Sequence, residues 1–326
     1  MNMEKVLEVK NLKMYYFTSK GVVKAVDDIS FELKKGETLG LVGESGCGKT
    51  TTGFSLLKMP SPPGKIVGGE ILINGEDIMP LSENEMRKSV RWQKIAMVFQ
   101  GAMNCLTPVY TIERQMMETL QLHKPMSKEE ARETMKKYLG YVGLSEDILK
   151  RYPHELSGGM KQRVTIAMAL FLEPEVIICD EPTTALDVVV QAQIINLLKD
   201  LKEKLKLSFI FITHDLATEA EVSDRIAVMY AGKIVEVGTN QQIYGEQGPA
   251  HPYTQKLLGA TPKLHENVKE LAFIPGTPPD LLEPPTGCRF HPRCPVAMEK
   301  CKKEEPILNE IEPNHFAACW RCLNEQ

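Results

Sequence analysis

The segment GESGCGKT at positions 43 to 50 constrains the fold of this chain more than any other feature. It follows the apolar run TLGLV, which is typical of a buried strand, and it precedes TTGFSLLKM, which is typical of the start of a helix. The segment matches G-x-x-x-x-G-K-[ST], a glycine-rich loop whose backbone N–H groups point at phosphate oxygens. The sequence therefore predicts a phosphate-binding loop within an α/β fold.

This loop supplies most of the residues that we expect to hold a nucleotide such as ATP. Lys49 is expected to reach the β- and γ-phosphates, and the Thr50 hydroxyl is expected to coordinate magnesium. Tyr16 offers an aromatic face that would stack on adenine, although packing within its own strand region is the alternative. The predicted loop contacts are Gly43, Ser45, Gly46, Cys47, Gly48, Lys49, Thr50 and Thr51.

Polar residues follow three further strand-like segments. In VIICDEP (176 to 182), Asp180 is expected to hold magnesium and Glu181 to act as general base for the attacking water. Gln100 ends IAMVFQ, where its amide would bind magnesium and that water. His214 ends FIFITH, where its imidazole would contact the γ-phosphate. These positions predict a hydrolytic site at the polar ends of neighbouring strands.

The segment LSGGMKQR (156 to 163) indicates a second subunit. Ser157, Gly158 and Gly159 precede a helical run, so they would form a second anion-binding helix N-terminus. Because the chain already has one phosphate loop, this second contact makes most sense if it serves a partner's nucleotide. Asp187 in TTALD is expected to cross to the partner, so that two subunits arranged head to tail would bury two ATP molecules.

The pattern along the chain predicts a P-loop NTPase (RecA-like) core in residues 1–240. This core would contain an antiparallel β subdomain, which includes two strands within 6–35, and a helical subdomain inserted at about 102–170. The composition changes after Gly238, and residues 249–313 are rich in proline, which opposes long helices. Residues 241–326 are therefore expected to be a small metal-binding extension, reached through an extended connector.

Five of the eight cysteines lie in the last 40 residues. Four of them have the spacing C-x5-C-x6-C-x17-C, namely Cys288, Cys294, Cys301 and Cys319. Four thiolates suit either zinc or an iron–sulfur cluster, and the spacing does not distinguish the two. Cys322 would be able to replace Cys319, His291 and His315 are weaker alternatives, and free thiols are the alternative to any metal site.

Composition excludes some classes of protein. The net charge of −4 argues against nucleic acid as a partner, since nucleic-acid binding usually needs a basic face. No apolar run approaches the roughly 18 residues needed to cross a bilayer. The segment MNMEKVLEVK lacks the features of a signal peptide, so a cytoplasmic location is expected.

Taken together, these motifs resemble those of the nucleotide-binding subunits of ABC transporters, over residues 5 to 240. In that family Gln100, Asp187 and His214 would be the Q-loop, the D-loop and the switch histidine. Met160 departs from the glutamine usual in the signature. The segments HPYTQKLL, IPGTPPDLLEPPTGCRFHPRCPVAMEKC and AAC (317 to 319) narrow the resemblance to the oligopeptide and dipeptide importer ATPases.

This resemblance implies a peripheral subunit on the cytoplasmic face of the membrane that hydrolyses ATP with Mg²⁺ and powers import of dipeptides or oligopeptides. The implied partners are a second ATPase subunit (usually a different chain, or a second copy in isolation), two membrane permease subunits docked on the helical insert, and an external peptide-binding protein. It also favours a [4Fe–4S] cluster on the four cysteines, with zinc as the alternative. Nickel or another small solute is the alternative cargo.

Two other classes share parts of this pattern. A DNA-maintenance ATPase carries the same cassette, but such proteins tend to insert a coiled coil or metal module between the phosphate loop and the signature. The slightly acidic net charge also opposes that class. A non-hydrolysing regulatory subunit is the other alternative, which the intact Lys49, Glu181 and His214 oppose.

Overall fold

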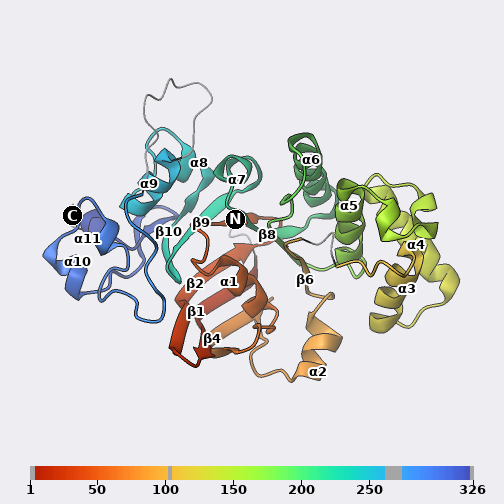
Figure 1. The fold of residues 1–326 in the computed structure, drawn as a ribbon, viewed down its shortest axis with the longest axis horizontal. Helices are drawn as coiled ribbons and strands as arrows, with labels where there is room; N and C mark the ends of the chain where they lie inside the picture. Colours follow the sequence, from red (N-terminus) through yellow and green to blue (C-terminus); the bar gives the residue numbers. More distant parts are fainter. Residues whose placement is uncertain (1–3, 102–104, 261–273, 324–326) are drawn as a thin grey trace. The chain divides into compact units, whose positions relative to one another are not determined.

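The computed structural model of the chain describes residues 4–101, 105–260 and 274–323 (Figure 1). It divides into two compact units, neither of which is continuous in sequence. The first consists of Met1–Leu7, Leu33–Gly36 and Ile73–Phe211, and the second of Glu8–Glu32, Glu37–Leu72 and Ile212–Gln326. Residues 102–104, where the predicted helical segment begins, lie outside the described residues.

The second unit contains the phosphate-loop segment and the C-terminal tail. Its β-strands follow the orders β2-β1-β4 and β11-β12-β10-β9-β3. β3 pairs in parallel with β9, whereas β9–β10 and β10–β12 are antiparallel pairs. The strands are β1 (Lys5–Thr18), β2 (Gly21–Lys34), β3 (Thr38–Val42), β4 (Gly64–Ile73), β9 (Arg225–Tyr230), β10 (Lys233–Thr239), β11 (Asn309–Glu312) and β12 (His315–Ala317).

The helices of the second unit are short. They are α1 (Lys49–Leu56), α7 (Leu216–Val222), α8 (Asn240–Tyr244), α9 (Pro252–Gly259), η5 (His291–Arg293), α10 (Glu299–Lys303) and α11 (Trp320–Leu323).

The first unit combines a parallel strand pair with the helical segment. β6 and β7 pair in parallel, and all residues of β6, β7 and β8 are buried, as expected for apolar runs covered on both faces. Helices α3, α4 and α5 lie next to one another in Figure 1. The elements are β5 (Glu76–Asp77), α2 (Glu83–Glu85), η1 (Met86–Val90), β6 (Ile95–Val98), α3 (Ile112–His123), α4 (Lys128–Tyr141), η3 (Glu146–Lys150), η4 (Pro153–Glu155), α5 (Gly158–Ala169), β7 (Val176–Asp180), α6 (Val188–Leu205) and β8 (Ser208–Ile212).

Local sequence signals predicted these elements well. The turn between β4 and β5 contains Asn74 and Gly75 with φ of 51° and 79°, the left-handed pair that an Asn-Gly hairpin turn requires. Helices also form within 105–170 as the acidic starts and apolar spacing predicted. For example, Ser127 caps α4 and forms a reciprocal capping box with Glu130.

The tail differs from the expected extended connector. α9 begins at Pro252, where the missing N–H of proline costs nothing because the first helical turn lacks an intrahelical partner. Strand β12 joins the sheet through β10, with Glu236 opposite Ala317. Tyr230, Tyr253 and Phe290 are at most 1% exposed, and their ring centroids lie 4.6–5.3 Å apart. The tail therefore packs through these aromatic rings against β9, in place of an extended connector.

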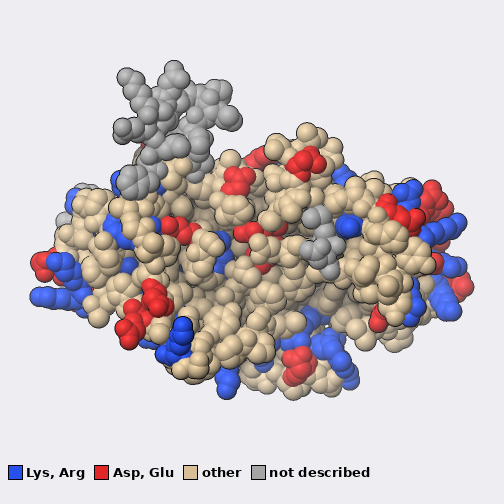
Figure 2. Space-filling model, in the orientation of Figure 1, with Lys and Arg blue, Asp and Glu red and all other residues tan. Residues whose placement is uncertain are grey.

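Charged residues of both signs are interspersed on the face drawn in Figure 2. Neither sign forms an extended field on that face, in keeping with the small net charge. No helix in the described part of the chain is both long enough and apolar enough to span a bilayer.

Candidate functional site

The phosphate loop connects β3 to α1, as its sequence predicted. Gly43 and Gly48 have φ of 148° and 110°, backbone conformations that L side chains rarely adopt. A Cβ at Gly43 would lie 2.1 Å from the carbonyl oxygen of Met229, and one at Gly48 would lie 2.3 Å from that of Ala25. Both glycines are therefore required for the loop to pass this close to the neighbouring backbone.

Lys49 is the first residue of α1, and its side chain folds back over the loop. Its Nζ donates hydrogen bonds to the carbonyl oxygens of Gly43 at 2.7 Å and Glu44 at 3.1 Å. Lys49 and Cys47 are buried, whereas Ser45 and Gly46 are exposed. The loop thus holds a buried cation beneath an exposed rim, an arrangement suited to an anion that approaches from solvent.

Two further residues of the predicted loop set, Cys47 and Thr51, have surroundings that bear on their roles. Burial raises the pKa of the Cys47 thiol, so this cysteine stays protonated and acts as a packing residue. The Tyr16 hydroxyl lies 3.4 Å from the Thr51 hydroxyl, next to Thr50. The aromatic ring predicted to stack on adenine therefore lies beside α1, within the second unit.

The ends of β6 and β7 bring Gln100 and Glu181 together in the first unit. Asp180 is 1% exposed at the end of β7, and Glu181 follows it with φ of 47°, an uncommon conformation for a residue with a side chain. Nε2 of Gln100 donates to Oε2 of Glu181 at 2.8 Å, and the Thr184 hydroxyl donates to the same oxygen at 2.9 Å. The carboxylate of the predicted base is thus oriented by two donors.

The signature serine caps a helix, as predicted. Helix α5 begins at Gly158, and the Ser157 hydroxyl accepts a hydrogen bond from Met160 N at 3.3 Å. A Cβ at Gly159 would lie 2.6 Å from Val190 Cγ1, so the glycine permits close packing of α5 on α6. Asp187 similarly caps α6 by accepting from Val190 N at 3.0 Å.

His214 is exposed between β8 and α7, next to the capping residue Asp215. Like the phosphate loop and Tyr16, it belongs to the second unit, whereas Gln100, Asp180, Glu181, Ser157 and Asp187 belong to the first. Within each unit the structure joins Tyr16 to Thr51, and Gln100 to Glu181.

Several residues at these positions lie outside the predicted set. Thr184 donates a hydrogen bond to Glu181 from three positions downstream, and the two threonines after VIICDEP are the available sequence signal. Glu44 occupies a variable position of the loop motif, yet it contacts Arg293 and Tyr253 from the distant tail. No local pattern in the sequence indicates those long-range contacts.

The tail cysteines gather from three segments. Cys288 N donates to the carbonyl oxygen of Cys301 at 2.8 Å. Burial, together with the neighbouring Cys301, Cys319 and Cys294, raises the pKa of Cys288 to about 12. A hydrogen bond from Cys322 lowers the pKa of Cys319 to about 6. Nevertheless, among the described residues no group of three or more His, Cys, Asp or Glu side chains is arranged to hold a metal ion. The metal-binding character predicted for this tail is therefore not confirmed.

Comparison with protein families gives two matches. Residues 26–184 match the ABC transporter family, and residues 235–301 match the C-terminal region of oligopeptide/dipeptide transporters. The first match includes every predicted motif from the phosphate loop to the acids after β7, and the second includes three of the four clustered cysteines.

Individual proteins are similar over nearly the whole chain. The dipeptide transport ATP-binding protein DppD of Bacillus subtilis is 48% identical, over 98% of this chain and 95% of its own length. The oligopeptide transport ATP-binding protein OppD of Escherichia coli is 46% identical, over 98% and 94%. The structure of the ATP-binding cassette MJ0796, a dimer in a post-hydrolysis state with ADP and phosphate, is 30% identical with a TM-score of 0.64, over 72% of this chain and 98% of that one.

The match to the ABC transporter family covers the glycine loop leading into α1, the acids at the end of β7 and the capped signature helix described above. The chain therefore belongs to the ABC transporter ATP-binding family, and it carries the C-terminal region that is characteristic of oligopeptide/dipeptide transporters.

Proposed function

We propose that this chain is the ATP-binding and ATP-hydrolysing subunit of an importer that moves dipeptides or oligopeptides across the cytoplasmic membrane. The observation that carries the ATPase assignment is the carboxylate of Glu181, held by Gln100 and Thr184 at the end of a buried strand. The names of the relatives from Bacillus subtilis and Escherichia coli support peptides as the cargo over nickel.

In this proposal the second unit binds the triphosphate. Loop N–H groups hold the phosphate oxygens, Lys49 leaves its carbonyl partners for the β- and γ-phosphates, and Tyr16 stacks on adenine. His214 contacts the γ-phosphate. The exposed rim at Ser45 and Gly46 supports this role, because an incoming anion reaches those N–H groups without displacing packed side chains.

Magnesium fits the oxygen donors available, namely the Thr50 hydroxyl, the buried Asp180 carboxylate and the Gln100 amide oxygen. When bound, the ion neutralises charge on the β- and γ-phosphate oxygens. The protein's own residues orient the attacking water. The Glu181 carboxylate accepts a proton from that water, and Gln100 fixes the position of the carboxylate. The chemical step relies on positioning and electrostatics more than on covalent participation.

The same proposal makes the chain half of an ATPase pair. Ser157, Gly158 and Gly159 would contact the partner's nucleotide, and Asp187 would reach the partner. The dimeric state of the MJ0796 cassette supports this arrangement. We propose a second ATPase chain as partner, two permease subunits docked on the helical segment, an external peptide-binding protein, and a peripheral position on the cytoplasmic face.

The test is ATP-driven uptake by the assembled transporter in proteoliposomes. We expect uptake of labelled dipeptides and longer peptides only when ATP is present on the side of the membrane where this subunit lies. We expect no uptake of nickel. ATP-dependent nickel uptake without peptide uptake would favour the alternative cargo. An assembled complex that binds ATP without hydrolysing it would instead make this chain a regulatory subunit.

We further propose that Cys288, Cys294, Cys301 and Cys319 hold a [4Fe–4S] cluster. Thiolates suit iron–sulfur centres and zinc alike, and the resemblance of the tail to those of the peptide importer ATPases favours the cluster. The proximity of Cys301, Cys319 and Cys294 to Cys288 supports a shared site. Stoichiometric iron and sulfide with visible absorbance in anaerobically purified protein support the cluster, whereas a colourless protein with one zinc per chain contradicts it.

A further inference from the structure

We infer that the C-terminal tail braces the phosphate loop through Glu44, which makes Arg293 and Tyr253 positioning residues for nucleotide binding. The inference rests on the proposed role of residues 43–50 as the ATP-binding loop. All the contacts that carry it lie within the second unit.

Arg293 holds the side chain of Glu44. Its Nη1 and Nη2 donate to Oε2 and Oε1 of the carboxylate at 2.7 Å and 3.0 Å, which is a bidentate pair. The Arg293 side chain is 6% exposed and that of Glu44 is 23% exposed, so water screens this pair little. Nε of Arg293 also donates to the carbonyl oxygen of Pro275 at 2.8 Å, which fixes the guanidinium plane.

Tyr253 holds the backbone of the same loop residue. Its hydroxyl accepts a hydrogen bond from Glu44 N at 2.9 Å, and its ring is fully buried. The Glu44 carbonyl oxygen in turn accepts from Lys49 Nζ at 3.1 Å. Glu44 is therefore tied at its N–H, its carboxylate and its carbonyl oxygen, and the last tie leads to the lysine proposed to reach the phosphates.

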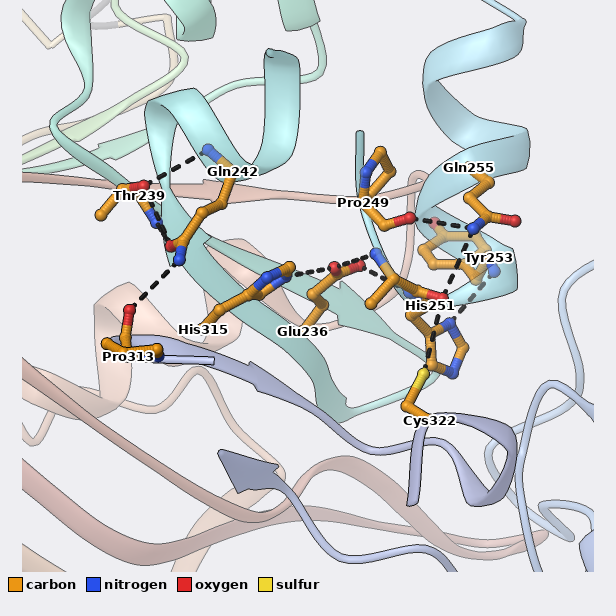
Figure 3. A network of polar contacts seen from close by, with 11 residues as sticks. Glu236, Thr239, Gln242, Pro249, His251, Tyr253, Gln255, Pro313, His315 and Cys322 are labelled. Carbon is orange, nitrogen blue, oxygen red and sulfur yellow. Dashed lines mark hydrogen bonds and ion pairs between the residues drawn. The ribbon is translucent and has the colours of Figure 1, made fainter. Parts of the chain in front are cut away.

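A buried polar network fixes Tyr253 (Figure 3). Glu236 of β10 is fully buried and accepts hydrogen bonds from the N–H groups of Ala250 at 2.6 Å and His251 at 3.2 Å. Nε2 of His315, in β12, lies 2.8 Å from Oε1 of Glu236. Nδ1 of His251 then caps α9 by accepting from Tyr253 N at 3.0 Å. The last strand of the tail is thus linked to the loop through α9.

The physical consequence concerns binding rather than chemistry. A phosphate loop works only when its N–H groups already point at the anion, because ordering them on binding costs affinity. Loss of the brace would leave the loop in several conformations, of which a fraction is competent. The dissociation constant for nucleotide would rise, whereas kcat at saturating ATP would stay the same.

The experiment compares Arg293→Gln with the wild-type full chain. Calorimetric titration with MgATP is expected to show a dissociation constant about 3- to 30-fold higher in the variant. The assembled transporter is expected to show a raised KM for ATP with kcat retained. Arg293→Lys is expected to be intermediate, because an ammonium keeps the charge but lacks the planar fork.

Arg225→Gln is the control. Arg225 belongs to the same unit and its side chain is also largely buried, at 11% exposed, but it pairs with Glu37, just before β3 and at the opposite end of that strand from the loop. Its replacement is expected to lower stability without changing the MgATP dissociation constant. Glu44→Gln, on the exposed side of the contact, is expected to reproduce the effect of Arg293→Gln, and the double variant to add nothing further.

The inference is overturned if Arg293→Gln binds MgATP as the wild type does, if Arg225→Gln raises the dissociation constant equally, or if the Glu44 and Arg293 effects add. A wild-type chain that binds no MgATP would overturn the proposed function itself. The two failures are therefore distinguishable in one set of titrations.

Discussion

Gln100 donates a hydrogen bond from Nε2 to Oε2 of Glu181 at 2.8 Å, although 81 positions separate the two residues in the sequence. The contact exists because β6 and β7 are parallel neighbours, so both side chains emerge at the same edge of the sheet. A neutral amide next to the proposed base orients the carboxylate without adding charge.

Glu181→Gln should abolish turnover and leave ATP binding intact. The amide preserves the shape and the contact with Thr184 but cannot accept the proton of the attacking water, a loss worth about 10²- to 10⁴-fold. Steady-state hydrolysis by the assembled transporter and MgATP titration of the isolated chain measure the two properties. Hydrolysis at the wild-type rate would refute the role of general base.

Gln100→Glu should shift the pH dependence of kcat. A second carboxylate beside Glu181 raises the pKa of the base, because like charges disfavour ionisation. The acidic limb of the pH–rate profile is therefore expected to move to higher pH. Gln193→Glu, at an exposed position of α6, adds the same charge elsewhere and should leave the profile unchanged. Identical profiles for the two variants would mean that the Gln100–Glu181 contact does not persist during turnover.

The Ser157→Asp variant tests recognition of the partner's nucleotide while keeping an N-cap on α5. Aspartate is as good an N-cap as serine, so the free energy of unfolding should change by less than about 0.5 kcal/mol. The added charge would face the partner's γ-phosphate, so ATP-induced dimerisation of the Glu181→Gln chain should be lost.

Thr111→Asp, at the N-cap of α3, is the corresponding control and should dimerise normally. Sizing chromatography with light scattering in MgATP measures the effect. Unimpaired dimerisation of the Ser157→Asp chain would remove the head-to-tail arrangement from the proposal.

The buried carboxyl group of Glu219 should make the free energy of unfolding depend on pH. Its side chain lies in α7 beneath Gly40 of β3, hydrogen-bonded to the Ser223 hydroxyl, while its Oε2 has no hydrogen-bond partner among the described residues. Burial, with a smaller contribution from Asp215, raises the pKa of Glu219 to about 8.

Between the unfolded-state pKa of about 4.3 and the folded value, the folded chain binds one proton more than the unfolded chain. The free energy of unfolding should therefore fall as pH rises through this window and level off above pH 8. Glu219→Gln, which needs no proton, should flatten the slope and be the more stable form at pH 8. Denaturant titrations from pH 5 to pH 9 check this, and parallel slopes for the two proteins would contradict the assignment.

Much of the candidate site could be predicted because its signals are local. A strand, a glycine loop and a helix need only neighbouring residues, so the strand–loop–helix arrangement around Lys49 and Thr50 could be predicted. The caps at Ser157 and Asp187 are local as well, because each side chain bonds an N–H three positions away.

Contacts between distant segments escaped the sequence for a physical reason. The tail's prolines correctly indicated short helices, but nothing local shows that β12 pairs with β10 or that the ring of Phe290 packs edge-on against that of Tyr230. The gathering of the cysteines likewise depends on how the segments around Cys288 and Cys301 pack.

The sequence by itself determined the family and so the class of chemistry, since the loop glycines, Lys49, Asp180 and Glu181 are placed by backbone conformations and strand ends that short-range interactions specify. Only the tertiary structure decided that the tail contacts the phosphate loop, because Arg293 and Glu44 are 249 positions apart in the sequence. Such a pairing depends on the summed packing of many residues, and any arginine and any glutamate would satisfy the local pattern equally well.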